Sequence, residues 1–289
     1  MKLFDPSLRF YKGNLHTHTT NSDGRATPEE CMRLYKEHGY DFLALTDHWF
    51  VEKEQTYQGM LILPGAEYDF TFPTQVLHIL CLFPDKKLSE GIARGITHQE
   101  VIARVNGVGG VVICAHPAWS LNTNEFLQSL DGVEIAEIYN SMSAEPYNSP
   151  RANSEGILDV AAANGKLFNL VAADDTHYYQ GEQCQSYTML QAEELSVPAI
   201  LDALRKGRFY ASQGPEFKNI ERIGDEIAVE TSPVSLITFC SNKCWIPGRS
   251  SQGDGLTEKV YKIQPGEKYV RVQITAADGK KAWSSPIPV

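Results

Sequence analysis

The chain has 289 residues, which is enough for one α/β domain with a small appendage. Its 36 acidic and 26 basic residues give a net charge of −10, and this balance argues against an extended nucleic-acid-binding surface. There is no apolar run of the roughly 18 residues that a membrane-spanning helix requires, and the first residues lack the apolar stretch of a secretory signal. We therefore expect a cytoplasmic protein without a membrane partner.

Short apolar runs alternate with helix-like segments over most of the chain. The expected strands are 14–19, 42–46, 61–66, 76–83, 111–115, 133–139 and 167–173. The expected helices begin after Thr27 and Thr97 with capping boxes, span about 151–163, and follow Ser196. This alternation predicts an α/β fold with a parallel sheet or barrel.

The pattern changes after Gly214. Short strands are expected at 227–230, 236–240, 260–263 and 269–275, separated by turns that contain glycine. This pattern is typical of a small antiparallel β-sandwich, so we predict two domains, 1–213 and 214–289.

The six cysteines are scattered and are expected to be reduced thiols. Cys240 and Cys244 lie four residues apart, but no second pair of cysteines or histidines accompanies them. We therefore do not expect a structural zinc site there.

Histidines and carboxylates recur at or beside the predicted strands. Because the carboxyl ends of parallel strands meet at one edge of a sheet, these side chains are expected to form one metal centre. His16 and His18 are expected on one face of a strand, since they are two residues apart. The candidate ligands are His16, His18, Asp23, His48, Glu67, His78, His116, Asp175 and His177. The remaining histidines, His38 and His98, lie in predicted helices and are interpreted as surface or capping residues.

Nitrogen and oxygen ligands of this kind suit zinc, manganese or iron, and their number implies two or three divalent ions with Glu67 as a bridge. A hydroxide held between such ions can serve as the nucleophile. Consistent with this, the sequence contains neither a G-x-S-x-G elbow nor a G-x-x-x-x-G-K-[ST] phosphate loop.

The order and spacing of these motifs resemble those of the PHP (polymerase and histidinol phosphatase) family of metal-dependent phosphoesterases. The motifs are His16-Thr17-His18, Ser22-Asp23-Gly24, Thr46-Asp47-His48, Gly65-Ala66-Glu67, His78, Ala115-His116-Pro117 and Asp175-Thr176-His177. The resemblance covers about 13–214 and implies a distorted (βα)₇ barrel. The segment 12–19 and the β-rich tail are similar to a carbaryl-hydrolase-like subgroup.

The resemblance also implies three groups of ligands. His16, His18, Glu67 and Asp175 would hold one ion; Glu67, His78 and His116 a second; Asp23, His48 and His177 a third.

Further residues are candidates for catalysis and substrate binding. We expect Glu67, His48, Asp175 and Arg151 to be catalytic. Arg151, in the irregular segment 140–151, either grips a phosphate or is simply solvated. Trp119 either stacks on a base or only lines the pocket, and Tyr178 is similarly placed. Asp47 and Asp174 lie beside ligands and either orient imidazoles as second-shell residues or cap backbone amides.

The leading hypothesis is a phosphoesterase that acts on a small phosphorylated metabolite or nucleotide. An ester, amide or carbamate hydrolase is the alternative, because the same nucleophile can attack a carbonyl. A third hypothesis, from a different class, is a binding module in which the metals are structural.

Overall fold

The computed structural model describes residues 1–289. The helices are α1 (Pro28–Glu37), η1 (Lys86–Ser89, 3₁₀), α2 (His98–Gly107), α3 (Asn124–Gln128), α4 (Glu155–Ala163) and α5 (Val197–Arg205). The strands are β1 (Arg9–Asn14), β2 (Phe42–Leu45), β3 (Gln55–Tyr57), β4 (Met60–Thr71), β5 (Val76–Leu82), β6 (Val111–Cys114), β7 (Ile135–Asn140), β8 (Asn169–Ala173), β9 (Tyr187–Ala192), β10 (Phe209–Ser212), β11 (Phe217–Ile223), β12 (Glu226–Ser241), β13 (Ser250–Lys262), β14 (Tyr269–Thr275), β15 (Lys281–Trp283) and β16 (Ile287–Pro288). None of the helices has the length and apolar character needed to cross a bilayer.

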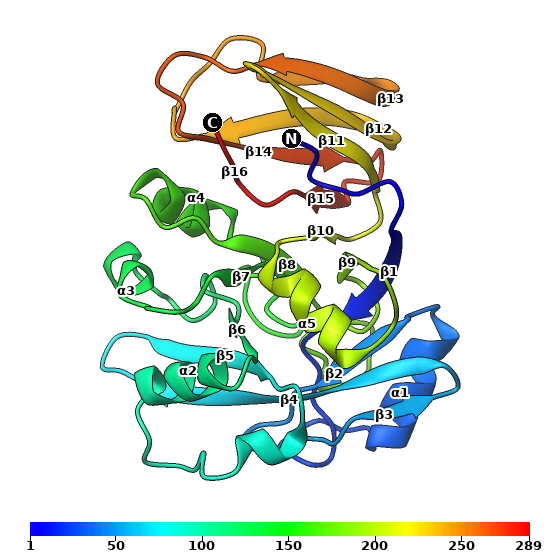
Figure 1. The fold of residues 1–289 in the computed structure, drawn as a ribbon, viewed down its shortest axis with the longest axis vertical. Helices are drawn as coiled ribbons and strands as arrows, with labels where there is room; N and C mark the ends of the chain where they lie inside the picture. Colours follow the sequence, from blue (N-terminus) through cyan, green and yellow to red (C-terminus); the bar gives the residue numbers. More distant parts are fainter.

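The strands form one hydrogen-bonded sheet with the order β11-β12-β14-β15-β10-β9-β1-β2-β4-β5-β6-β7-β8 (Figure 1). Outside this order, β13 pairs with β12, β16 with β14 and β3 with β4. The pairs β1/β2, β2/β4, β6/β7 and β7/β8 are parallel, whereas β5 is antiparallel to both β4 and β6. The segments that follow β1 and β8 also meet, because Thr17 and Thr176 form a parallel bridge. The mixed α/β class is confirmed. The finer (βα)₇ barrel stays a prediction, since β5 and β9 interrupt the strand–helix repeat.

The apolar runs of the sequence become strands that are covered on both faces. In β2, Phe42 and Ala44 pack in a cluster with α5, while Leu43 and Leu45 pack in another cluster with α1. Side chains alternate along a strand, so one continuous apolar run can serve both layers.

The two predicted capping boxes are present. Thr27 and Thr97 each accept a hydrogen bond from the backbone of the Glu three residues later, which caps α1 and α2. α4 begins at Glu155 instead of near residue 151, because Asn153 still pairs with Tyr139 of β7 and the chain cannot yet turn into a helix.

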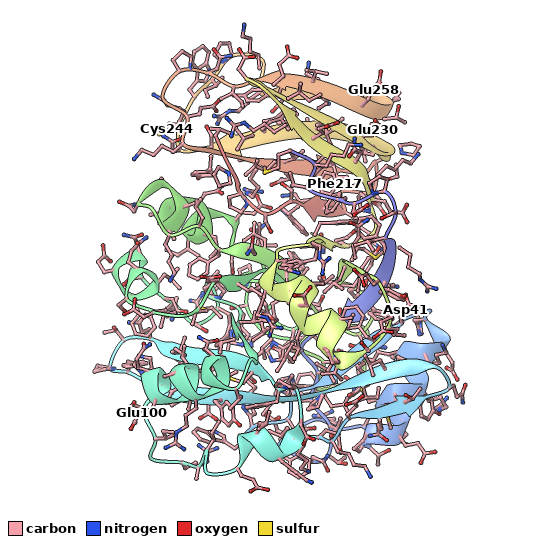
Figure 2. The ribbon with its side chains drawn as sticks, viewed as in Figure 1. Asp41, Glu100, Phe217, Glu230, Cys244 and Glu258 are labelled. Atoms are coloured by element: carbon pink, nitrogen blue, oxygen red, sulfur yellow. The ribbon has the colours of Figure 1, made fainter.

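Residues 214–289 form antiparallel strands, as expected, but 227–230 and 236–240 are parts of a single strand, β12. Figure 2 labels Glu230 and Glu258, cross-strand partners on β12 and β13, and Cys244 on the outer surface. The description as a sandwich and the domain boundary at 213/214 stay predictions.

The C-terminal strands are attached to α4 by partly buried polar contacts. Arg271 binds Asp159 through two hydrogen bonds of 3.1 and 2.8 Å, and Trp283 Nε1 donates to Glu155 Oε1 over 2.9 Å. Lys281 also pairs with Glu155, at 3.0 Å. The segment between β7 and α4 lines the candidate site described below. Because α4 follows this segment, the contacts of α4 with the C-terminal strands fix the end of the segment.

Candidate metal centre

The nine candidate ligands converge at one edge of the sheet. His48 and His116 lie just beyond β2 and β6, and both Asp175 and His177 follow β8. His78 is near the beginning of β5, and an antiparallel strand presents its beginning where its parallel neighbours end.

Two details of the expected placement are wrong. His16 and His18 lie beyond β1, which ends at Asn14, so they do not share a face of a strand. The chain leaves β9 after Gly13 and pairs instead with the segment that follows β8, as the hydrogen bond from Asp175 N to His16 O shows. Glu67 lies inside β4 and not at its end, because the antiparallel pairing with β5 extends β4 to Thr71.

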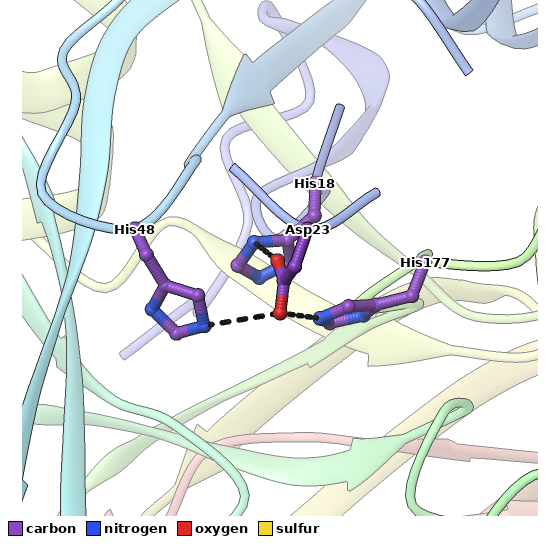
Figure 3. A group of neighbouring side chains, drawn as sticks. All are labelled: His18, Asp23, His48 and His177. Atoms are coloured by element: carbon purple, nitrogen blue, oxygen red, sulfur yellow. Dashed lines mark ion pairs between the residues drawn. The ribbon is translucent and has the colours of Figure 1, made fainter. Parts of the chain in front are cut away.

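The side chains form three groups whose potential ligand atoms lie within 4.8 Å of one another. One group is His16, His18, Glu67 and Asp175; the second is Glu67, His78 and His116; the third is Asp23, His48 and His177 together with His18. Figure 3 shows the third group, in which the carboxylate of Asp23 lies between the imidazoles. These groups include neither Cys240 nor Cys244.

The backbone around the centre adopts conformations that non-glycine residues rarely take. The φ angles are 29° at His116, 57° at Asp175 and 56° at Trp49, the residue after His48. Left-handed non-glycine residues cost free energy and cluster at functional sites. The strain therefore supports a functional role for this edge of the sheet.

Outer contacts orient the imidazoles, and the sequence analysis missed the most important of them. Glu137 of β7 is fully buried, and its Oε1 lies 2.8 Å from His16 Nδ1. Its Oε2 accepts hydrogen bonds from His116 N and Asn140 Nδ2, both at 2.8 Å. Donation by Nδ1 leaves Nε2 of His16 with its lone pair toward the centre. A glutamate inside an apolar strand was the available signal, because a buried charge requires partners.

Neither Asp47 nor Asp174 contacts an imidazole directly. Asp47 accepts hydrogen bonds from the backbone and hydroxyl of Thr19 and from Ser22 Oγ, each at 2.7 Å. Asp174 accepts from the backbone amides of Cys184, Gln185 and Ser186, at 2.7–2.9 Å. The alternative therefore applies to Asp174, which stabilises loop backbone, whereas Asp47 reaches His18 through Ser22, whose Oγ lies 3.3 Å from His18 Nδ1.

Negative charge dominates the electrostatics of the centre. Burial would lower the pKa of His16, but the carboxylates of Asp175 and Glu67 outweigh it and raise the pKa to about 10. Burial would conversely raise the pKa of Glu67, yet His16 and His78 hold it well below its usual value. The buried carboxylates thus demand positive charge, which protons or metal cations can supply.

Divalent ions fit this donor set. Oδ1 of Asp175 and Nδ1 of His48 are buried and make no hydrogen bond, although such atoms are normally satisfied. Nε2 of His16 and Nε2 of His18 lie 3.1 Å apart, and both face Oδ1 of Asp175, at 3.0 and 3.2 Å. Imidazole and carboxylate ligands converging in this way are typical of zinc, manganese or iron sites.

A pocket of about 280 Å³ opens onto the centre, and seven of the nine candidate ligands line it. Trp119, Asn148 and Tyr178 line the same pocket. Trp119 and Asn148 also line a neighbouring cleft of about 420 Å³, which contains Arg151. Arg151 therefore does not lie in the metal pocket itself but beside it.

The environment of Tyr178 was not anticipated. The guanidinium of Arg25 lies 4.6 Å from the centre of the Tyr178 ring, a cation–π contact. Arg25 N also donates to His177 O over 2.8 Å. This arrangement brings a second arginine to the rim, where the sequence indicated only Arg151.

His38 lies at the exposed end of α1, as expected. His98 differs from the expectation. Its ring packs against Phe70 and Phe72, with centroids 5.8 and 5.5 Å apart. Burial also lowers the pKa of His98. It is therefore a packing residue of α2, away from the metal centre.

Comparison with solved structures identifies the fold. A two-domain protein of Bacteroides vulgatus, which contains a predicted PHP-like metal-dependent phosphoesterase, superimposes with a TM-score of 0.54 at 14% sequence identity. The match covers 98% of this chain and 97% of that one. The chain has a PHP-like fold. The similarity to the Bacteroides vulgatus structure includes the C-terminal strands. Membership of the carbaryl-hydrolase-like subgroup stays a prediction.

Two other matches cover less of the chain. A candidate metal-dependent phosphoesterase of Bifidobacterium adolescentis has a TM-score of 0.40 and 18% identity, over 57% of this chain and 87% of that one. In sequence, an uncharacterised protein of Methanocaldococcus jannaschii is 28% identical over 149 residues, which are 44% of this chain and 82% of that protein. No model of a known protein family matches the sequence.

Proposed function

We propose that this PHP-like protein is a metal-dependent phosphoesterase that acts on a small phosphorylated metabolite or nucleotide. The observation that carries the proposal is the convergence of nine imidazole and carboxylate ligands in three groups beside an open pocket. Structural metal sites are usually closed by protein ligands, whereas catalytic sites keep room for water and substrate. The pocket of about 280 Å³ supports the catalytic alternative.

The proposed roles follow from the grouping of the ligands. His16, His18, Glu67 and Asp175 hold the first ion, Glu67, His78 and His116 the second, and Asp23, His48 and His177 the third. Zinc, manganese or iron ions there would lower the pKa of water and neutralise phosphate oxygens. Glu67, as a member of two groups, fixes their relative position. Glu137 and Ser120 orient His16 and His116, through contacts of 2.8 and 3.0 Å with their Nδ1 atoms.

Substrate binding is assigned to the rim of the pocket. The side chain of Arg151 is exposed and makes no hydrogen bond or ion pair with the protein, so it is free to bind anionic oxygens. Trp119 contributes an aromatic wall shared by the pocket and the neighbouring cleft. Tyr178 and the Arg25 guanidinium above its ring add a second cationic side to the rim. These features suit a substrate with a negative group and a flat or apolar remainder.

The test is a comparison of four substrates with the metal-loaded protein: p-nitrophenyl phosphate, bis(p-nitrophenyl) phosphate, p-nitrophenyl acetate and a p-nitrophenyl carbamate. Hydrolysis of a phosphoester that disappears on chelation, and in His16→Ala, is the expected result. His38→Ala, a histidine outside the centre, is the matched control and should be fully active. Hydrolysis of the carbonyl esters alone would refute the phosphoesterase and favour the alternative hydrolase. No hydrolysis at all by the metal-loaded protein would favour a non-catalytic binding module.

A further inference from the structure

Another buried carboxylate, that of Glu182, lies five residues beyond His177, the last candidate ligand in the sequence. Its side chain is almost completely buried, and it accepts hydrogen bonds from four consecutive backbone amides. Oε1 receives those of His177, Tyr178 and Tyr179, at 3.2, 2.5 and 2.6 Å, and Oε2 receives that of Gln180, at 2.9 Å. Four amides directed at one carboxylate fix the path of the turn 177–182.

The backbone conformation of the turn makes it dependent on its hydrogen bonds. Tyr179 and Gly181 have φ angles of 58° and 124°, in the left-handed region. A non-glycine residue there is strained, so the surrounding contacts must compensate. The turn has further anchors: the hydroxyl of Tyr179 donates to His18 O over 2.6 Å, Arg25 N donates to His177 O over 2.8 Å, and the hydroxyl of Tyr147 donates to Gln180 O over 3.0 Å.

The turn presents His177 to the outermost group of ligands. His177 Nδ1 lies 2.7 Å from Asp175 O, which directs Nε2 toward Asp23 Oδ2, 3.5 Å away (Figure 3). On the other side of Asp23, His48 Nε2 lies 3.8 Å from the same oxygen. The His177 ring stacks on that of His18, with centroids 4.1 Å apart.

The outer group differs from the inner ones in how it is built. Its side chains are 55% exposed at Asp23, 21% at His48 and 17% at His177, whereas those of His16, His18 and Glu67 are at most 2% exposed, that of Asp175 is 9% exposed and that of His78 is 16% exposed. Among the inner ligands, Glu67 and His78 lie inside the paired strands β4 and β5, and Glu137 binds His16 and His116. The position of His177 depends on a solvent-facing turn, and Glu182 binds four consecutive backbone amides of this turn.

We propose that Glu182 is a positioning residue for the third metal site: it holds the turn 177–182 so that His177 faces Asp23 and His48. The inference rests on the metal centre of the proposed function, but it concerns the occupancy of one site and not the reaction. Loss of Glu182 weakens binding of one ion and leaves the two inner ions in place. The protein therefore changes from a three-ion to a two-ion form when this carboxylate is removed.

The experiment counts bound ions in the 289-residue protein. Cobalt(II) titration followed by absorption spectroscopy and calorimetry is applied to wild type, Glu182→Ala, Glu182→Gln and His177→Ala. His177→Ala removes the ligand itself, so Glu182→Ala should reproduce its loss of one ion, or bind that ion at least tenfold more weakly. Glu182→Gln should be intermediate, because its single carbonyl oxygen can still accept the three amides that now reach Oε1. Glu193→Gln, an exposed glutamate outside the centre, should bind ions like wild type.

Several results would overturn the inference. Three ions bound with wild-type affinity by Glu182→Ala would do so, as would loss of all ions from a variant that remains folded by circular dichroism. If Glu182→Ala does not fold, Glu182→Gln decides, and failure of both to fold would assign Glu182 to global stability instead. A wild-type protein that binds only two ions would also overturn it, while leaving the proposed hydrolysis, measured separately on phosphoesters, intact.

Discussion

Replacement of Glu137 by glutamine tests whether the buried carboxylate controls the metal centre. The substitution keeps the size of the side chain but exchanges one oxygen for an NH₂ group. Placed against His16, that group must donate to Nδ1, which reverses the tautomer and turns Nε2–H toward the centre. If the NH₂ group instead takes the place of Oε2, it faces His116 N and Asn140 Nδ2, two donors that now bind Oε2. Neither orientation preserves all three hydrogen bonds of 2.8 Å.

The expected magnitude follows from the hydrogen bonds that this substitution removes. Removal of an outer partner of a metal-binding histidine typically costs about 10- to 100-fold in metal affinity. Each factor of ten corresponds to about 1.4 kcal/mol. Because Glu137 contacts ligands of two different groups, His16 and His116, we expect an effect near the upper end, about 2–3 kcal/mol for the inner ions.

Metal affinity of Glu137→Gln is measured by competition with a chromophoric chelator, with parallel urea unfolding of the metal-free protein. Glu134→Gln is the matched control, since Glu134 lies three residues earlier in the same segment but is exposed. A folded Glu137→Gln protein with wild-type affinity for every ion would refute the argument that tautomer control by Glu137 matters.

Three further predictions concern the site and its surroundings. Chelation should lower the melting temperature, because ions at 100 times their Kd stabilise the fold by about 2.7 kcal/mol; an unchanged calorimetric transition would contradict bound metal. Arg151→Ala should raise the KM for a phosphoester about tenfold with kcat nearly unchanged, since one charge-assisted interaction outside the metal centre is removed; a fall in kcat alone would contradict its binding role. Burial would raise the pKa of Glu155, but hydrogen bonds from Asn153 and Lys281 outweigh it and hold the pKa below its usual value. The ionised Glu155 therefore stabilises the fold above about pH 4.3, and this contribution is lost as the pH falls through the folded-state pKa. Urea unfolding should show Glu155→Gln to be less stable than wild type by about 1 kcal/mol at pH 7 and by less at pH 3; a pH-independent difference would contradict the assignment.

The sequence was most informative about features that depend only on residues close together in the chain. The capping boxes at Thr27 and Thr97 specify the beginnings of α1 and α2 without reference to the rest of the chain. The extent of a strand, by contrast, depends on its partners. β4 continues past Glu67 only because β5 pairs with it as far as Thr71, and β1 stops at Asn14 because the following residues pair with the segment after β8.

The types and order of the candidate ligands are properties of the sequence alone. Imidazoles and carboxylates next to apolar runs indicate a metal centre, because the ends of strands in an α/β fold share one edge. The tertiary structure alone decided which side chains support them. Glu137 reaches His16 across 121 residues of sequence, whereas Asp47 and Asp174, adjacent to ligands, contact no imidazole directly. Adjacency along the chain does not determine the direction of a side chain, and the partner of a buried charge is set by the packing of distant elements.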